Sequence, residues 1–181
     1  MKERTAVIVS LGATLLILAS ASFAQQKDLS LSAGVGGGDY NTCFVAGLSG
    51  SFPLVPLVQG EAEAFYYRMP ADRSTVEGLA ITSTAMDVDL ALLLQAGASS
   101  RTFVPYASLQ AGLIYESETW KYSLLKTKAS HSYSLWNVGL GVGTKILLGS
   151  KSGIRLDFRW LRVLGRNIQI PRASLGFFFH V

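Results

Sequence analysis

The sequence predicts an all-β protein in which eight antiparallel strands close into an up-and-down transmembrane β-barrel, after a cleaved N-terminal signal peptide. Three observations predict this fold class. Apolar and polar residues alternate with a period of two, no apolar run after residue 24 is long enough for a membrane-spanning helix, and only 15% of residues are charged. Without helices, a chain crosses a bilayer only as a closed barrel, because every backbone N–H and C=O must be paired within the protein.

The first 24 residues have the pattern of a secretory signal peptide. Lys2 and Arg4 give a basic start, residues 5–19 form an apolar run, and Ser22 and Ala24 are the small residues that precede a cleavage site. The alternative is an uncleaved N-terminal anchor. We therefore expect a signal peptide over residues 1–24 and a single barrel domain over residues 25–181.

Eight segments show the alternation of a strand, and each is long enough to form one. The expected strands are residues 29–37, 42–52, 55–67, 81–95, 102–115, 130–147, 153–161 and 168–181. In the first four, one face carries apolar side chains such as Leu31 and Val35, Phe44 and Leu48, Ala64 and Tyr66, and Leu90 and Leu92. In the last four, the corresponding residues are Leu109 and Leu113, Val138 and Leu140, Leu156 and Phe158, and Leu175 and Phe177.

The connections between these strands alternate in length. Residues 53–54, 97–101 and 148–152 form short turns, residues 68–80 and 116–129 form long polar loops, and residues 38–41 and 162–167 are intermediate. All short turns fall at one end of the barrel, which is typical of outer-membrane barrels. We therefore expect the short turns and both termini in the periplasm.

Alternation alone does not decide which face lies inside. A lipocalin-like carrier places its apolar face inward, whereas a membrane barrel places that face against lipid. The polar face is rich in small residues such as Gly112, Gly141 and Gly176, which suit the narrow interior of an eight-stranded barrel. Aromatic residues near the strand ends are expected to form interfacial girdles, namely Tyr66, Tyr67, Tyr115, Tyr133, Trp136, Trp160 and Phe177. The polar face is therefore expected to line the lumen.

Charged residues on the polar face are expected to form a charge network within the lumen. A hairpin centred on residue 75 places Glu61 near Asp89 and Glu63 near Asp87. Because carboxylates opposite one another destabilise a sheet, we expect bases to face them across the barrel. These are Lys145, Arg155, Arg159 and Arg172, with Asp157 among them. The alternative is an ordinary set of charges on the wet face of a soluble sheet.

Three segments carry a family resemblance. Residues 104–113 read VPYASLQAGL, residues 153–160 read GIRLDFRW, and residues 173–181 read ASLGFFFHV. They resemble strands of the small outer-membrane β-barrel proteins of the OmpA, OmpX and opacity-protein type. The resemblance implies a place in the outer membrane of a Gram-negative-type bacterium, contact with its lipid and lipopolysaccharide, and insertion by the barrel-assembly machinery. Family members usually end in an aromatic residue, whereas this chain ends in Val181.

Barrels of this type include structural proteins, adhesins, narrow pores and lipid-modifying enzymes. We expect a monomeric barrel with a structural or surface-interaction role, closed by side chains and without enzymatic activity. The alternatives are a narrow pore for small solutes or ions, a lipid-modifying enzyme, and a periplasmic lipocalin-like carrier.

No motif predicts a catalytic, cofactor or metal site. His131, His180 and the single Cys43 do not match zinc spacing. Residues 131–134 resemble the His and Ser of outer-membrane lipid A deacylases, but no nearby carboxylate follows to orient the histidine. The formal net charge of +4 is too mild to predict nucleic-acid binding.

The outer loops are the expected place of function. Trp120, Lys121 and Tyr122 lie in the loop at residues 116–129, and Arg162 and Arg166 lie in the last outer loop. Basic groups at that height are expected to pair with lipopolysaccharide phosphates. The alternative is a solvated loop without a partner.

Overall fold

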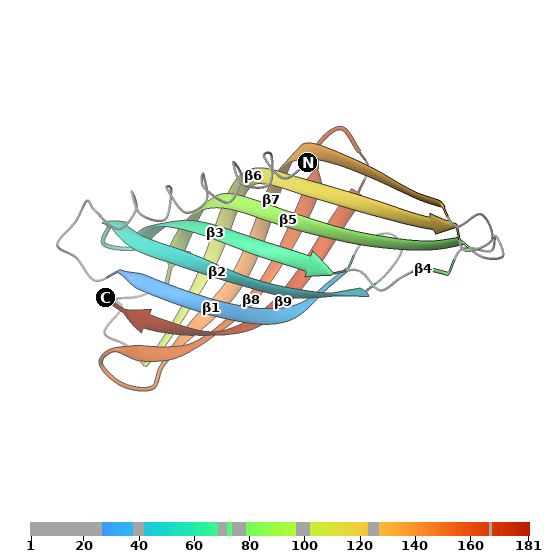
Figure 1. The fold of residues 1–181 in the computed structure, drawn as a ribbon. Coiled ribbons are helices and arrows are strands. Elements are labelled where there is room, and N and C mark those ends of the chain that lie inside the picture. Colours follow the sequence, from blue (N-terminus) through green and yellow to red (C-terminus); the bar gives the residue numbers. More distant parts are fainter. Residues whose placement is uncertain are drawn as a thin grey trace.

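The computed structural model of the chain is an antiparallel β-barrel whose strands differ greatly in length (Figure 1). It describes residues 27–37, 42–68, 72–73, 79–96, 102–122, 127–166 and 168–181. The strands are β1 (Asp28–Gly37), β2 (Thr42–Val55), β3 (Val58–Arg68), β4 (Asp72–Arg73), β5 (Leu79–Gln95), β6 (Phe103–Tyr122), β7 (Thr127–Leu147), β8 (Ser152–Val163) and β9 (Ile168–His180). The expected signal peptide and the expected connections at residues 38–41 and 97–101 lie outside the described residues. Among the residues that the structure describes, no helix is long and apolar enough to cross a membrane.

Eight of the described strands form a closed ring. They follow the order β3-β2-β1-β9-β8-β7-β6-β5, all neighbours are antiparallel, and β3 also pairs with β5. The two-residue strand β4 lies along β5, where Asp72 is the register partner of Ile81. The eight-stranded up-and-down barrel expected from the sequence is confirmed.

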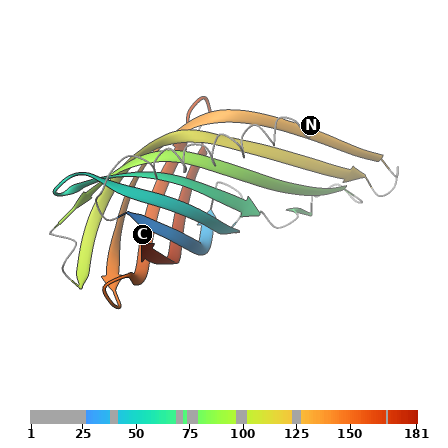
Figure 2. The same cartoon turned by 60° about the vertical axis from the view of Figure 1, so that its left-hand side comes forward.

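The two ends of the barrel differ. At one end the described chain termini meet, because the N–H of Val181 donates to the carbonyl of Lys27 at 2.9 Å. The turns between β2 and β3 and between β7 and β8 lie at this end, which we call the short-turn end. At the opposite end β5, β6 and β7 continue well past their neighbours (Figures 1 and 2).

Two connections differ from the sequence-based expectation. The turn expected at residues 53–54 lies at residues 56–57, because β2 continues to Val55 through a register shift beside Pro53. Such an irregularity accommodates a proline, which has no N–H for the ladder. The polar loop expected at residues 116–129 is largely strand, with β6 and β7 paired as far as Tyr122 and Thr127. Its Thr, Tyr and Ser residues favour strand conformation even where water contacts both faces of the sheet.

The side chains divide between lumen and exterior as the membrane-barrel alternative requires. Leu90, Leu109 and Phe177 point outward and are 55–57% exposed. Glu61 and Arg159 point into the lumen and are at most 2% exposed. The apolar outer face therefore has the character of a lipid-facing surface, and the lipocalin-like arrangement is wrong.

Two glycines show how tightly the lumen is filled. A Cβ on Gly112 would lie 1.9 Å from Oδ1 of Asp89, and one on Gly143 would lie 2.4 Å from the phenol ring of Tyr106. These positions leave no space for a side chain, because a neighbouring strand's side chain occupies it. The small residues of the polar face are thus required by packing within the barrel.

An apolar cluster fills the lumen near the extended end. It contains Cys43, Val45, Phe65, Tyr67, Ala85, Ile114, Leu161, Val163 and Ile170, and we call it the apolar plug. Its members continue the inward-facing positions of their strands, as Phe65 follows Glu63 and Leu161 follows Arg159. The lumen is therefore polar at mid-height and apolar towards the extended end.

Candidate functional site: lumen and strand extension

The centre of the lumen is crossed by ion pairs between opposite walls. Strand β8 is four strands from β3 in either direction around the ring. Arg155 on β8 binds both carboxylate oxygens of Glu61 on β3, with Nη2 at 2.9 Å from Oε1. Arg159 on β8 reaches the same carboxylate at 2.7 Å. These contacts bridge the full width of the barrel.

Arg159 has no solvent exposure and is held from several sides. Its guanidinium lies 2.9 Å from Oδ1 of Asp157 and 3.2 Å from Oε2 of Glu63, and it also donates to the side-chain oxygen of Gln110. A buried guanidinium has five donors to satisfy, and unpaired burial of such a charge is strongly unfavourable. The surrounding oxygens meet that requirement.

Arg172 on β9 joins the charged region to the apolar plug. It lies 2.6 Å from Glu63 and 3.8 Å from Asp87, and it donates to the hydroxyl of Tyr67 at 3.1 Å. Its guanidinium carbon lies 3.7 Å from the ring centroid of Phe65. Arg172 thus pairs with carboxylates on one side and stacks on an aromatic ring on the other.

A third group of charges lies near the short-turn end. Nζ of Lys145 is 2.5 Å from Asp28 and 2.7 Å from the side-chain oxygen of Gln59. Nδ1 of His180 lies 2.6 Å from the other oxygen of Asp28. Sequence reasoning missed Asp28, although it precedes Ser30 and Ser32 in the same inward phase. His180 faces the lumen from the last strand.

The hairpin register expected for the acidic residues is wrong. Glu63 is the register partner of Asp89, and Glu61 is the partner of Ala91. The hairpin is centred on residue 76, one residue further along the chain. Asp89 consequently lies beside Gln110, whose Nε2 donates to Oδ2 at 2.5 Å, and it forms no ion pair with any described residue.

The structure brings the other eight residues of the expected charge network into ion pairs. They are Glu61, Glu63, Asp87, Lys145, Arg155, Asp157, Arg159 and Arg172. No group of three or more His, Cys, Asp or Glu side chains in the described ranges is arranged to hold a metal ion. The site is a network of ion pairs that fills the lumen of the barrel.

The second feature is a sheet of three long strands that continues the barrel wall, with the two-residue strand β4 paired along its β5 edge. It comprises residues 79–83 of β5, 116–122 of β6 and 127–136 of β7, and we call it the strand extension. It begins where β3 and β8 stop pairing, at the partners Arg68–Thr84 and Val163–Asn137. Figure 2 shows it projecting past the other strands.

The outer face of the wall changes character at the base of the strand extension. Met86, Tyr115 and Trp136 are its last large apolar or aromatic residues on β5, β6 and β7. Beyond them the outer face carries hydroxyl and lysine residues, namely Thr82, Thr84, Ser117, Thr119, Lys121, Lys128, Ser130, Ser132 and Ser134. This change occurs at nearly the same register on all three strands and marks the limit of the lipid-facing surface.

The expected aromatic girdle is present in part. Tyr66, Tyr115, Trp136 and Trp160 lie on the outer face where each strand leaves the apolar band. Tyr67 and Tyr133 do not belong to it, because they point to the inner side. Each is one residue out of phase with its outward neighbour, so strand alternation excludes it.

The inner face of the strand extension is held by polar contacts. The Tyr133 hydroxyl donates to Glu116 on the neighbouring strand, and the guanidinium of Arg166 lies 3.8 Å from the Tyr133 ring centroid. Burial and the carboxylate of Glu116 raise the pKa of Tyr133 above its usual value. Nε1 of Trp120 donates to Glu118 at 3.2 Å. Of these contacts, the one between Arg166 and Tyr133 connects the last outer turn to the strand extension.

The five residues expected to make surface contacts do not form one site. Lys121 is exposed on the outer face, whereas Trp120 and Tyr122 lie on the inner face. Arg162 is level with Val138, while Trp120 is level with Ala129. These levels are about 30 Å apart along β7, at roughly 3.4 Å per residue.

His131 and the two serines beside it lie on opposite faces of the strand extension. The histidine lies on the inner face, whereas Ser132 and Ser134 lie on the outer face, since successive strand residues point to opposite sides. The cross-strand partner of His131 is Glu118, which accepts its hydrogen bond from Trp120. The arrangement provides no Ser–His dyad.

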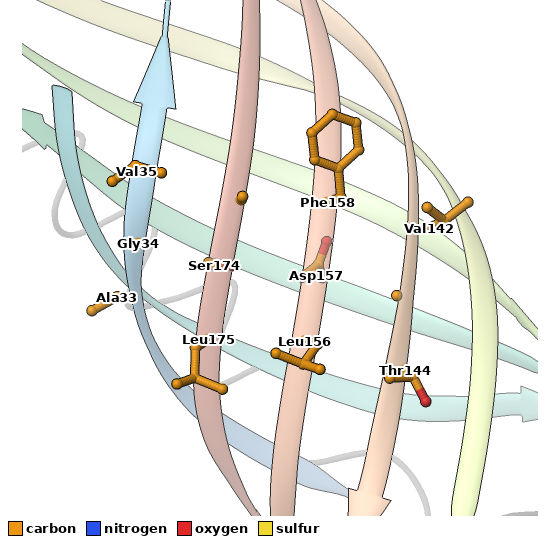
Figure 3. A pocket seen from close by; sticks show the side chains of 12 residues that line it. Ala33, Gly34, Val35, Val142, Thr144, Leu156, Asp157, Phe158, Ser174 and Leu175 are labelled. Carbon is orange, nitrogen blue, oxygen red and sulfur yellow. The ribbon is translucent and has the colours of Figure 1, made fainter. Parts of the chain in front are cut away.

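A shallow hollow of about 470 Å³ lies on the outer face of β1, β9, β8 and β7. Figure 3 shows Val35, Leu156, Phe158 and Leu175 along its walls. Its lining is almost entirely apolar and lies within the lipid-facing band. It therefore belongs to the membrane surface of the barrel.

Solved structures of outer-membrane proteins share this fold. A major outer membrane protein from Thermus thermophilus superposes with a TM-score of 0.69 at 10% identity, over 88% of this chain and 100% of that protein. Neisserial surface protein A gives 0.60 at 11% identity, over 85% and 95% of the two chains. Ail, the attachment invasion locus protein of Yersinia pestis, gives 0.59 at 11% identity, over 86% and 97%.

No protein-family model matches the chain, and no curated protein matches it in sequence. The structural similarity at these identities concerns the fold. At that level, the resemblance to small outer-membrane barrels expected from the sequence is confirmed.

Proposed function

We propose that this barrel spans the outer membrane of a Gram-negative-type bacterium and holds the strand extension at the cell surface, as a structural or surface-interaction protein. The shared fold and the apolar outer band support the membrane location. The strand extension lies opposite the short-turn end, which in outer-membrane barrels faces the periplasm.

The main support for a barrel that does not conduct ions is that side chains fill its lumen. Opposed ion pairs fill its middle, and the apolar plug lies above them towards the extended end. An ion entering from the surface would meet Val45, Phe65 and Leu161, which offer it no ligands. The barrel is therefore a rigid support for the strand extension.

Surface proteolysis of intact cells tests the location and the orientation together. Trypsin should cleave after Lys121 and Lys128 in the strand extension, and the cleaved protein should fractionate with outer membranes. Lys151 provides an internal control, because it lies in the exposed turn between β7 and β8 at the short-turn end. Cleavage there should require permeabilised cells. Recovery of the protein in the soluble periplasmic fraction, or cleavage at Lys151 first, would contradict the proposal.

A narrow pore is the second candidate. Four buried side-chain oxygen atoms have no hydrogen-bond partner among the described residues, namely Asp89 Oδ1, Ser108 Oγ, Asn137 Oδ1 and Thr144 Oγ1. The first three belong to residues that face the lumen, and such acceptors are suited to a hydrated cation. Planar-bilayer recordings decide between the candidates. A steady conductance of the wild-type protein that Glu61→Ala or Arg159→Ala increases would support the pore, and a silent bilayer would support the closed barrel.

A further inference from the structure

Charge is segregated between the two faces of the wall. Every carboxylate whose side chain the structure describes faces the lumen or the inner face of the strand extension: Asp28, Glu61, Glu63, Asp87, Asp89, Glu116, Glu118 and Asp157. Beyond the aromatic girdle, the described outer face carries the cations Arg68, Lys121, Lys128 and Arg162. Within the described residues, no carboxylate therefore shares the outer face with these cations.

Two of these cations lie directly opposite each other. Lys121 on β6 and Lys128 on β7 are register partners, both are exposed, and neither forms an ion pair with any described residue. Like charges at such positions, with Cβ atoms about 5 Å apart, destabilise a strand pair. An anion bound between the two ammonium groups would replace that repulsion with attraction.

Hydroxyl groups complete this arrangement. Thr119 and Ser130 are the next register partners on the same outer face, two residues nearer the membrane. Two ammonium and two hydroxyl donors on successive register pairs of one face suit a phosphate, which accepts several hydrogen bonds and interacts most strongly with charged donors. The inner-face residue Glu118 points away from this group.

The height of the site indicates which phosphate it meets. Lys121 is six residues beyond Tyr115, or about 20 Å along the strand and about 15 Å along the membrane normal at the usual strand tilt. A headgroup layer adds only about 5–7 Å to each side of the hydrocarbon core. Phospholipid phosphates therefore lie too low, whereas phosphorylated sugars of lipopolysaccharide extend above that layer.

We propose that Lys121, Lys128, Thr119 and Ser130 form a binding site for phosphate groups on the core sugars of lipopolysaccharide. The inference rests on the proposed outer-membrane location and orientation. The outer face of the strand extension continues the lipid-facing surface below Trp136, so the molecules standing beside it are the glycolipids of the outer leaflet. A soluble polyanion, by contrast, has no reason to approach the outer face of the strand extension rather than its inner face.

Calorimetric titration of the folded mature chain in detergent micelles tests the site. The probe is lipopolysaccharide core oligosaccharide released by mild acid, used with its phosphates and after their removal. Lys121→Gln and Lys128→Gln should each weaken binding of the phosphorylated probe about fivefold to tenfold, since each removes a charged donor. Lys121→Glu should weaken it further while keeping the strand pair, because it creates a cross-strand ion pair with Lys128. Lys151→Gln, at the short-turn end, should leave the affinity unchanged.

Equal binding of the dephosphorylated probe, or affinity unaffected by both lysine variants, would overturn the phosphate site. Lysine-dependent binding of a sulfated heparin fragment, without binding of the core oligosaccharide, would instead assign the site to soluble polysaccharide. Failure of the location is distinguishable, because surface proteolysis and fractionation measure it separately. A protein that is exposed at the cell surface but does not bind the oligosaccharide contradicts the phosphate site and leaves the proposed location intact.

Discussion

Arg155 and Glu61 lie on diametrically opposite strands and form a two-point ion pair through the centre of the barrel. A guanidinium and a carboxylate in this geometry fix both the distance and the rotation between the two walls. The pair therefore holds the two opposite walls of the barrel in a fixed arrangement.

Removal of one partner should destabilise the barrel strongly. Glu61→Gln leaves Arg155 and Arg159 short of a shared carboxylate, and breaking a buried pair costs about 3–5 kcal/mol. Urea unfolding from lipid vesicles, followed by tryptophan fluorescence, should show this loss. Glu118→Gln on the strand extension is the matched control and should change the unfolding free energy little. Equal effects of the two variants would show that the ion pair contributes no stability.

Gly112→Ala should destabilise the barrel because the added Cβ meets Asp89 Oδ1 at 1.9 Å and the Val88 carbonyl oxygen at 2.2 Å. Backbone of the neighbouring strand cannot yield as a flexible side chain does, so a cost of about 1–3 kcal/mol is expected. Gly149→Ala is the control, since nothing lies within 4 Å of its added Cβ. Heat-modifiable gel mobility measures both variants, and a normal transition temperature for Gly112→Ala would contradict the packed lumen.

The three tryptophans should report the membrane boundary. Trp136 and Trp160 lie on the outer face and are 63% and 49% exposed, whereas Trp120 lies on the inner face of the strand extension. In single-tryptophan proteins, brominated lipids should quench Trp136 and Trp160, and an aqueous quencher should act mainly on Trp120. Strong quenching of Trp120 by brominated lipid would place the boundary higher than the outer-face pattern does.

Glu116→Gln should lower the pKa of Tyr133 towards that of an ordinary tyrosine. The carboxylate accepts the phenol hydrogen bond and opposes phenolate formation by its charge, and both effects raise the pKa. Burial remains in the variant, so the pKa should fall only in part. Phenolate absorbance during an alkaline titration measures the change, with Tyr133→Phe identifying the signal. An unchanged titration would mean that burial alone sets the pKa.

The fold was predictable from the sequence because strand alternation and connection length are local properties. The inward direction of Arg155, Asp157 and Arg159 followed from their phase against Leu156 and Phe158. The partners across the lumen were not predictable to the residue. The register of β3 on β5 depends on a turn whose length alternation does not fix, so Glu63 faces Asp89 rather than Asp87.

The strand extension and the apolar plug were missed for different reasons. Polar residues at 116–129 predict a loop when polarity alone is considered. The strand nevertheless continues there, because Ser, Thr and Tyr also favour strands in water. Phe65 and Leu161 were in phase with the charged residues, and this signal could have identified the apolar plug. Asp28 was overlooked because it lies at the first residue of its strand.

Because the lumen encloses charged side chains, the net charge on the surface of the folded protein differs from the net charge of its sequence. The lumen holds six acidic and four basic side chains, namely Asp28, Glu61, Glu63, Asp87, Asp89 and Asp157 with Lys145, Arg155, Arg159 and Arg172. Folding hides more negative than positive groups, so the native protein presents a more basic surface to ion-exchange media than its unfolded chain does. Chromatographic retention thereby becomes a measure of barrel closure.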